Sequence, residues 1–100
     1  MISHIVMWQL KDEAKGALKN DNARLIKQKL ETLSADLDES EYLEVGINET
    51  DDPQACDVVL IAEFNSDNEM KEYAQHPKHL EVVDFIKAVT SSRHVVDYTQ

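Results

Sequence analysis

The clearest strand signal in this chain is the segment DVVLIAEF, residues 57–64. Successive side chains of a strand point to opposite faces of the sheet, and here both faces are apolar. One face carries Val58, Leu60, Ala62 and Phe64, and the other carries Val59 and Ile61. We therefore predict a strand at this segment, within a sheet that makes apolar contacts on both faces.

Three further strands are predicted around this segment, at residues 2–10, 42–48 and 93–99. In the first of them, Ile5 and Met7 share one face of the strand. The opposite face carries Ile2, His4, Val6, Trp8 and Leu10. In the strand at residues 42–48, the apolar face carries Leu43, Val45 and Ile47.

The first helix is predicted from a change of period after a polar loop at residues 11–20. Apolar residues recur at helical spacing from Ile26 to Leu37, as expected for a helix with one face against a core. Asp21 or Asn22 is the predicted N-cap, because short polar side chains accept hydrogen bonds from the first free N–H groups.

The second helix is predicted from its start signal and is split by a proline. Ser66 followed by Glu69 matches a capping box. Pro77 interrupts the helix because the residue before a proline disfavours the α conformation. The helical pattern then resumes with Leu80, Val83 and Ile86 facing inward.

The predicted order of elements is β-α-β-β-α-β, which is the ferredoxin-like arrangement. It is an α+β fold with a four-stranded antiparallel sheet and both helices on one face. No internal repeat, low-complexity tract or Pro/Gly-rich linker divides the 100 residues. We therefore predict a single domain over residues 1–100.

The face of the sheet away from the helices carries Ile5, Met7, Val59 and Ile61. Four large apolar side chains form a patch on the order of several hundred Å², and such patches usually mark an interface. A second copy of the chain is the simplest cover, since a two-fold interface needs only self-complementarity. We predict a homodimer, a dimeric α/β barrel; the alternative is a monomer with an apolar outer face.

Composition excludes several classes of protein. The formal net charge of −10 argues against nucleic-acid binding, which needs clustered Lys and Arg, and against binding to an anionic membrane. The single cysteine, Cys56, permits no intrachain disulfide and fits a reducing compartment. No apolar run is long enough to span a membrane, so a cytoplasmic location is expected.

No cofactor and no metal are predicted. With only Gly16 and Gly46, the chain has no Gly-rich phosphate loop. His76 and His79 lack a nearby Cys or His that would complete a zinc site.

The main candidates for chemistry lie in YAQHPKH, residues 73–79. A neutral imidazole such as His79 beside the phenol of Tyr73 can remove a carbon-bound proton, and the phenol can donate to the developing oxyanion. His4 lies on the strand face assigned to the helices and could reach the same cavity. The same residues also have a structural interpretation, in which His79 satisfies backbone groups at a helix start and Tyr73 packs in the core.

Several segments together resemble the stress-responsive A/B barrel family, also called Dabb. They are HIVMW at residues 4–8, LKDE at 10–13, EVG at 44–46, Tyr73 with HPKH at 76–79, and VDY at 96–98. The resemblance runs from one end of the chain to the other in the same order. It implies a ferredoxin-like fold and a homodimer closed by sheet-on-sheet packing.

One plant branch of that family resembles a cofactor-free polyketide cyclase that uses a His and a Tyr. By this similarity His79 would be the base and Tyr73 its hydrogen-bonding partner. The pocket between sheet and helices would be lined by His4, Val6, Trp8, Leu43, Leu60 and Val82. This chain departs from that branch in having Ile26 and Leu30 instead of aromatic residues, and in the bulk of Trp8.

Three functions are compatible with these observations. The first is a homodimeric stress-related protein that binds a small apolar or carbonyl ligand or has no enzymatic activity. The second is a cofactor-free acid–base enzyme, a cyclase or isomerase, that uses His79 and Tyr73. The third is a monooxygenase-like enzyme, because related dimeric barrels include monooxygenases.

Overall fold

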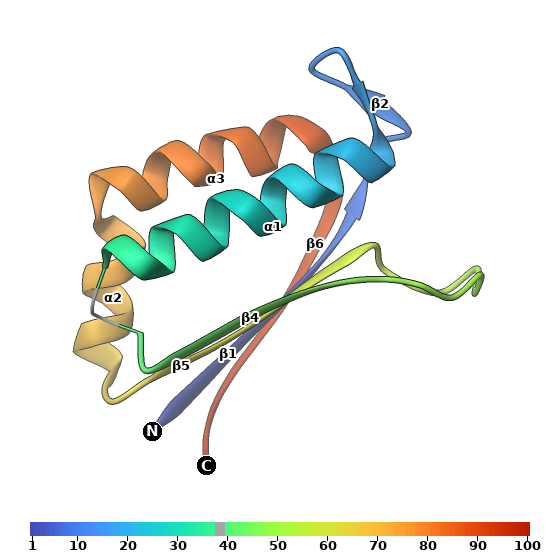
Figure 1. Cartoon of the computed structure of the whole chain (residues 1–100). Coiled ribbons are helices and arrows are strands. Elements are labelled where there is room, and N and C mark those ends of the chain that lie inside the picture. Colours follow the sequence, from blue (N-terminus) through green and yellow to red (C-terminus); the bar gives the residue numbers. More distant parts are fainter. Residues whose placement is uncertain (38–39) are drawn as a thin grey trace.

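The computed structural model of the chain, which describes residues 1–37 and 40–100, is a twisted sheet with helices on one face (Figure 1). The strands β1 (Ile2–Leu10), β4 (Tyr42–Ile47), β5 (Val58–Phe64) and β6 (Thr90–Thr99) form an antiparallel sheet in the order β4-β5-β1-β6. The helices are α1 (Lys19–Asp36), α2 (Asp67–Gln75) and α3 (Pro77–Val89). The predicted α+β, ferredoxin-like fold is confirmed.

The strand register places the side chains on the two faces that the sequence predicts. Val6 pairs with Leu60, and Met7 pairs with Val59. Val6 and Leu60 are 1% and 4% exposed on the helix-facing side, whereas Met7 is 41% exposed on the other side. Burial of the helix-facing apolar side chains against α1 and α3 forms the hydrophobic core.

The segment predicted as a loop, residues 11–20, contains a small hairpin instead. Its strands are β2 (Glu13–Ala14) and β3 (Ala17–Leu18). Lys15 and Gly16 have φ values of +54° and +75°, as the two central positions of a type I′ turn require. Gly16 adopts this conformation without the steric cost that a side chain brings.

The helix α1 starts at Lys19, earlier than predicted, and its N-cap residue, Leu18, makes no side-chain cap hydrogen bond. The prediction of Asp21 or Asn22 as N-cap is therefore wrong. Asn22 is completely buried, and its Nδ2 donates to the carbonyl oxygens of Ala14 at 2.9 Å and Ala17 at 3.3 Å. Its amide ties the β2–β3 hairpin to the first turn of the helix.

The start of α2 and the break before α3 follow the sequence signals. Ser66 Oγ accepts a hydrogen bond from the Glu69 N–H at 3.2 Å, so the predicted cap is confirmed. Pro77 is the first residue of α3, and His76 caps that helix by accepting the Lys78 N–H on its Nδ1 at 3.1 Å. The proline thus makes two helices from one helical pattern, and they meet at an angle (Figure 1).

The helices do not cover the sheet evenly. Leu43 and Val45 of the edge strand β4 pack into the core beneath α1. On the opposite edge strand, β6, Val95 pairs with Val6 and shares its face, yet 47% of Val95 is exposed. The sheet therefore has an open margin along β6. In the described part of the chain, no helix has both the length and the apolar character needed to cross a lipid bilayer.

Candidate functional site

A cavity of about 590 Å³ lies between the helix-facing side of the sheet and the helices α2 and α3. Small-molecule sites usually have volumes of roughly 300 to 1,000 Å³, so this cavity has a suitable size. It reaches the first residues of β6, at the open margin of the sheet. Most of its wall is apolar and includes Val6, Trp8, Leu60, Phe64, Val83 and Ile86.

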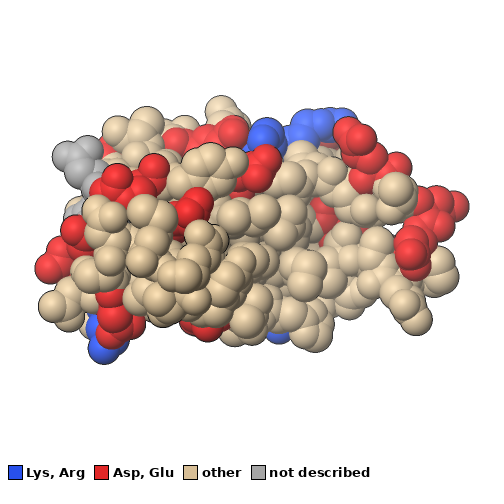
Figure 2. Space-filling view, turned by 90° about the horizontal axis from the view of Figure 1, so that it is seen from below, with Lys and Arg blue, Asp and Glu red and all other residues tan. Residues whose placement is uncertain are grey.

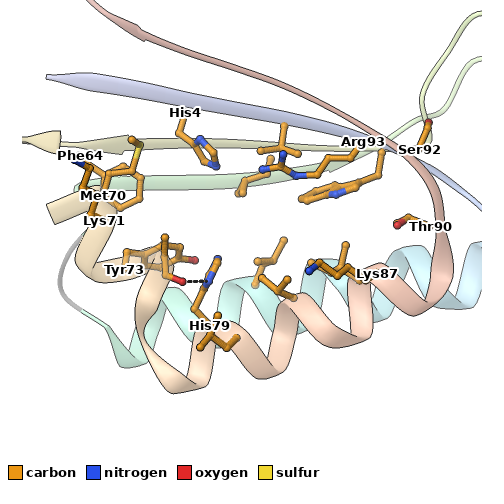
Figure 3. A pocket seen from close by; sticks show the side chains of 18 of the residues that line it. His4, Phe64, Met70, Lys71, Tyr73, His79, Lys87, Thr90, Ser92 and Arg93 are labelled. Atoms are coloured by element: carbon orange, nitrogen blue, oxygen red, sulfur yellow. Dashed lines mark hydrogen bonds between the residues drawn. The ribbon is translucent and has the colours of Figure 1, made fainter. Parts of the chain in front are cut away.

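Tyr73 and His79 meet at one end of this cavity (Figure 3). Tyr73 lies on α2 and His79 on α3, and the break before Pro77 turns the two side chains toward each other. Their ring centroids are 4.7 Å apart with an interplanar angle of 56°. Tyr73 is held in place by the Phe64 ring, whose centroid lies 5.4 Å away.

The hydrogen bonding of His79 fixes the tautomer of its neutral ring. Its Nδ1 lies 3.0 Å from the carbonyl oxygen of Ala74. A carbonyl oxygen only accepts, so Nδ1 is the donor and the neutral ring carries its lone pair on Nε2. Burial lowers the pKa of His79 below its usual 6.5; the bond to Ala74 opposes this shift, while His4 and His76 add to it. Burial thus favours the neutral form of the His79 ring.

A second imidazole enters the cavity from the sheet. His4 points from β1 toward the side where Tyr73 and His79 lie (Figure 3). Its Nδ1 is hydrogen-bonded to Oδ1 of Asp97, its register partner on β6. The sheet register therefore brings two residues from opposite ends of the chain together and fixes the orientation of the His4 ring.

The other end of the cavity is polar and cationic. Lys87 of α3 and Arg93 of β6 line it together with Thr90 and Ser92 (Figure 3). Sequence reasoning missed this end, because Lys87 looks like an ordinary solvated helix residue. One signal was available: Lys87 is four residues after Val83 and eight after His79, which places all three on one face of the helix.

Two residues expected in the pocket lie elsewhere. Leu43 packs against the core on β4, the strand that α1 covers. Val82 also packs against the core, on the side of α3 that faces α1. The neighbouring Phe85 marks that side, since Lys29 of α1 lies 4.9 Å from its ring centroid. The cavity wall does contain His4, Val6, Trp8 and Leu60.

His76 and His79 were not predicted to form a metal site. In the structure, the Nδ1 atom of His76 caps α3 and the Nδ1 atom of His79 donates to the carbonyl oxygen of Ala74. Within residues 1–37 and 40–100, no group of three or more His, Cys, Asp or Glu side chains could hold a metal ion. Cys56 lies outside the wall of the cavity as a partly buried free thiol.

The opposite side of the sheet presents an outer face, whose apolar residues are Ile5, Met7, Val59, Ile61, Val96 and Tyr98. Glu44, Glu63 and His94 share this face. Val96 and Tyr98, which the sequence analysis did not assign to it, are 52% and 45% exposed. The middle of this side of the molecule is largely uncharged, and acidic groups lie mainly toward its margins (Figure 2). All four residues predicted for an interface share this face.

Solved structures of similar shape share this architecture. A dimeric protein of unknown function with a ferredoxin-like fold from Bacteroides fragilis has 27% identity and a TM-score of 0.82, over 97% of this chain and 93% of that one. A Dabb family protein from Mesorhizobium loti has 18% identity and a TM-score of 0.77, over 99% and 95%. A hydroxynitrile lyase from Passiflora edulis has 19% identity and a TM-score of 0.79, over 97% and 90%.

Comparison with curated proteins gives no match. Comparison with family models gives one that spans nearly the whole sequence, the Stress responsive A/B Barrel Domain, over residues 2–100. The segments that carried the resemblance, from HIVMW at residues 4–8 to VDY at 96–98, all lie within this range. The chain therefore belongs to the stress responsive A/B barrel (Dabb) domain family.

Proposed function

We propose that this chain binds a small, mainly apolar molecule in the cavity between the sheet and helices α2 and α3. The observation that carries the proposal is the composition of the wall, which is apolar except for polar groups gathered at its two ends. Binding sites for small molecules combine an apolar lining with a few polar groups that orient the ligand. Here His4, Tyr73 and His79 form one such group.

The proposed assembly is a homodimer joined through the outer face. Met7, Val96 and Tyr98 leave large apolar areas in water in a single chain, and a second outer face would cover them. The dimeric description of the Bacteroides fragilis protein supports this assembly, since it shares the fold. The cavity lies on the opposite side of the sheet, so dimerisation leaves it accessible.

The binding proposal is tested with 2-octanone, an apolar carbonyl compound, titrated into the isotope-labelled protein and followed by NMR. The variant Ala74→Phe places a large ring in the wall of the cavity while its backbone still serves His79. Ala35→Phe is the matched control, because Ala35 is an exposed helical alanine on α1 outside the wall. We expect Ala74→Phe to weaken binding at least several-fold and Ala35→Phe to leave it unchanged. Equal binding by both variants contradicts a ligand in this cavity.

A second candidate function, acid–base catalysis, is favoured by the state of His79. Its Nε2 would accept a proton from the carbon next to a carbonyl group, and the electron pair of that C–H bond would form an enolate. The Tyr73 phenol, whose ring lies 4.7 Å from that of His79, would donate a hydrogen bond to the enolate oxygen. Return of the proton to carbon completes an isomerisation without a cofactor. The similarity in fold to a hydroxynitrile lyase is compatible with chemistry in this scaffold.

This chemistry is tested by hydrogen–deuterium exchange at the α-carbons of 2-octanone in heavy water. We expect the exchange rate with the protein to exceed the rate with an equal concentration of free imidazole. The variant His79→Gln should reduce the rate to that of imidazole or below. Tyr73→Phe should reduce the rate while 2-octanone still binds. Exchange no faster than with imidazole, in a protein that binds 2-octanone, leaves binding as the function and rejects catalysis of this kind.

A further inference from the structure

The charges around the cavity are the reverse of those on the protein as a whole. The chain has 20 acidic and 10 basic residues, yet the charged residues in the cavity wall are Lys71, Lys87 and Arg93. Among the residues that the structure describes, no Asp or Glu lines this wall. A positive cavity in a strongly acidic protein attracts an anion and is not explained by the composition.

Lys87 and Arg93 approach the same end of the cavity from opposite walls. Lys87 extends from α3, and Arg93 extends from the facing sheet, where its side chain runs along the sheet toward the His4 side (Figure 3). Arg93 pairs with Trp8 in the sheet, so the indole and the guanidinium leave the same face side by side. The two cations thus lie on facing walls of one cavity.

The backbone positions that carry the two cations are well separated from those that carry the imidazoles. Lys87 lies eight residues after His79 on α3, which corresponds to about 12 Å along a helix. On the opposite wall, Trp8, the register partner of Arg93, lies four residues after His4, or about 13 Å along a strand. Both walls therefore give a cavity with two different ends and apolar side chains between them.

Neither cation at this end is neutralised by the chain itself. Within residues 1–37 and 40–100, Lys87 and Arg93 have no ion-pair partner, whereas Lys71 pairs with Asp67 at 2.8 Å. Lys87 lies in the last turn of α3, where a cation interacts favourably with the helix dipole. Arg93 lies on the edge strand β6, where its exposed side chain lies beside the cavity.

We infer that the ligand is a small monocarboxylate whose carboxylate binds between Arg93 and Lys87 and whose apolar body extends toward His79 and Tyr73. The inference rests on the proposed function and names its ligand class. A guanidinium group binds a carboxylate through two parallel N–H···O bonds, and the Lys87 ammonium adds a third donor. A carboxylate has two oxygen atoms, so it can accept hydrogen bonds from both cations. The hydroxyl of Thr90, also in the wall, is a further donor at this end.

The test compares two probes that share their carbon skeleton and differ in charge, octanoate and octanamide, by calorimetric titration at neutral pH. We expect octanoate to bind about tenfold more tightly, because charged hydrogen bonds are roughly twice as strong as neutral ones. Arg93→Gln and Lys87→Gln should each reduce the affinity for octanoate several-fold and leave that for octanamide unchanged. Arg24→Gln is the control, since Arg24 is exposed on α1 and pairs with Asp21.

Orientation is tested separately by NMR with octanoate labelled with ¹³C at its methyl end. Nuclear Overhauser contacts from this methyl group to the rings of His79 and Tyr73 are expected, and contacts to the side chain of Lys87 contradict the orientation. If octanamide binds as tightly as octanoate, the monocarboxylate inference is wrong and the proposed binding function stands. If neither probe binds, and 2-octanone does not bind either, the proposed function itself fails.

Discussion

Replacing Ile61 with aspartate tests the proposed dimer, because Ile61 lies in the middle of the outer face. It pairs with Ile5 on one side and with Glu44 on the other, and it is partly buried in the single chain. In the monomer the new carboxylate remains in contact with water. In a sheet-on-sheet dimer it is buried against the partner's outer face, between Ile5 and the carboxylate of Glu44, and the two-fold symmetry places one copy in each subunit.

The expected effect follows from that burial. The effective cost of burying an unpaired charge is several kcal/mol, and about 3 kcal/mol per carboxylate is a conservative value. Two carboxylates then destabilise the dimer by about 6 kcal/mol. At 1.4 kcal/mol per factor of ten, the dissociation constant rises roughly 10⁴-fold. A dimer with a nanomolar constant would become a monomer at micromolar concentration.

Sedimentation velocity over a range of protein concentrations measures this change. Circular dichroism checks that Ile61→Asp retains the fold, and Leu18→Asp serves as control because Leu18 is 61% exposed on β3, away from the outer face. We expect a folded monomer for Ile61→Asp and an unchanged dimer for Leu18→Asp. A folded Ile61→Asp variant that dimerises like the wild type would refute the assignment of the outer face as the interface.

Three further predictions concern stability. Because burial lowers the pKa of His79, the unfolded chain binds this proton at a higher pH than the folded chain does. As the pH falls, the free energy of unfolding therefore begins to decrease near pH 6.5 and continues to decrease through the pKa of His79 in the folded chain. Urea unfolding at neutral pH and near pH 5 should show a smaller decrease in His79→Gln than in the wild type. Asn22→Ala leaves two hairpin carbonyls without their donor and should cost about 1 to 3 kcal/mol in urea unfolding, whereas Asn20→Ala, an exposed neighbour, should change it by less than about 0.5 kcal/mol. Ser66→Ala should cost about 1 kcal/mol through loss of the cap to Glu69, and Ser66→Asp should retain most of that stability; equal losses in both would contradict the capping role.

The strands and the faces of the sheet could be predicted because their signals are local. Alternation in residues 57–64 assigns each side chain to a face, and Pro77 marks its own position at the start of α3. The β2–β3 hairpin could not be found in this way, since strands of two residues have no alternation to detect. Gly16 was the available signal, but the positive φ of Lys15 beside it has no sequence signature.

Some residues of the candidate site could also be predicted from local signals, and others could not. Tyr73 and His79 are close in sequence, so helical geometry and the proline were enough to bring them together as candidates. Lys87 and Arg93 belong to different elements, and they share one end of the cavity only because β6 is the edge strand beside the open margin. Leu43 was expected in the pocket from the resemblance to the plant branch of the family. Its actual place depends on α1 covering β4, which is a property of the packing.

Ligand binding in the cavity is tested with the four histidines of the chain as probes. His4 and His79 line the cavity, whereas His76 and His94 are outside its wall and serve as internal controls. Ring ¹H–¹³C spectra are recorded while 2-octanone is added at constant pH. We expect saturable shifts of the His4 and His79 signals and constant signals from His76 and His94. Shifts of equal size at all four rings, or at none, would contradict ligand binding in this cavity.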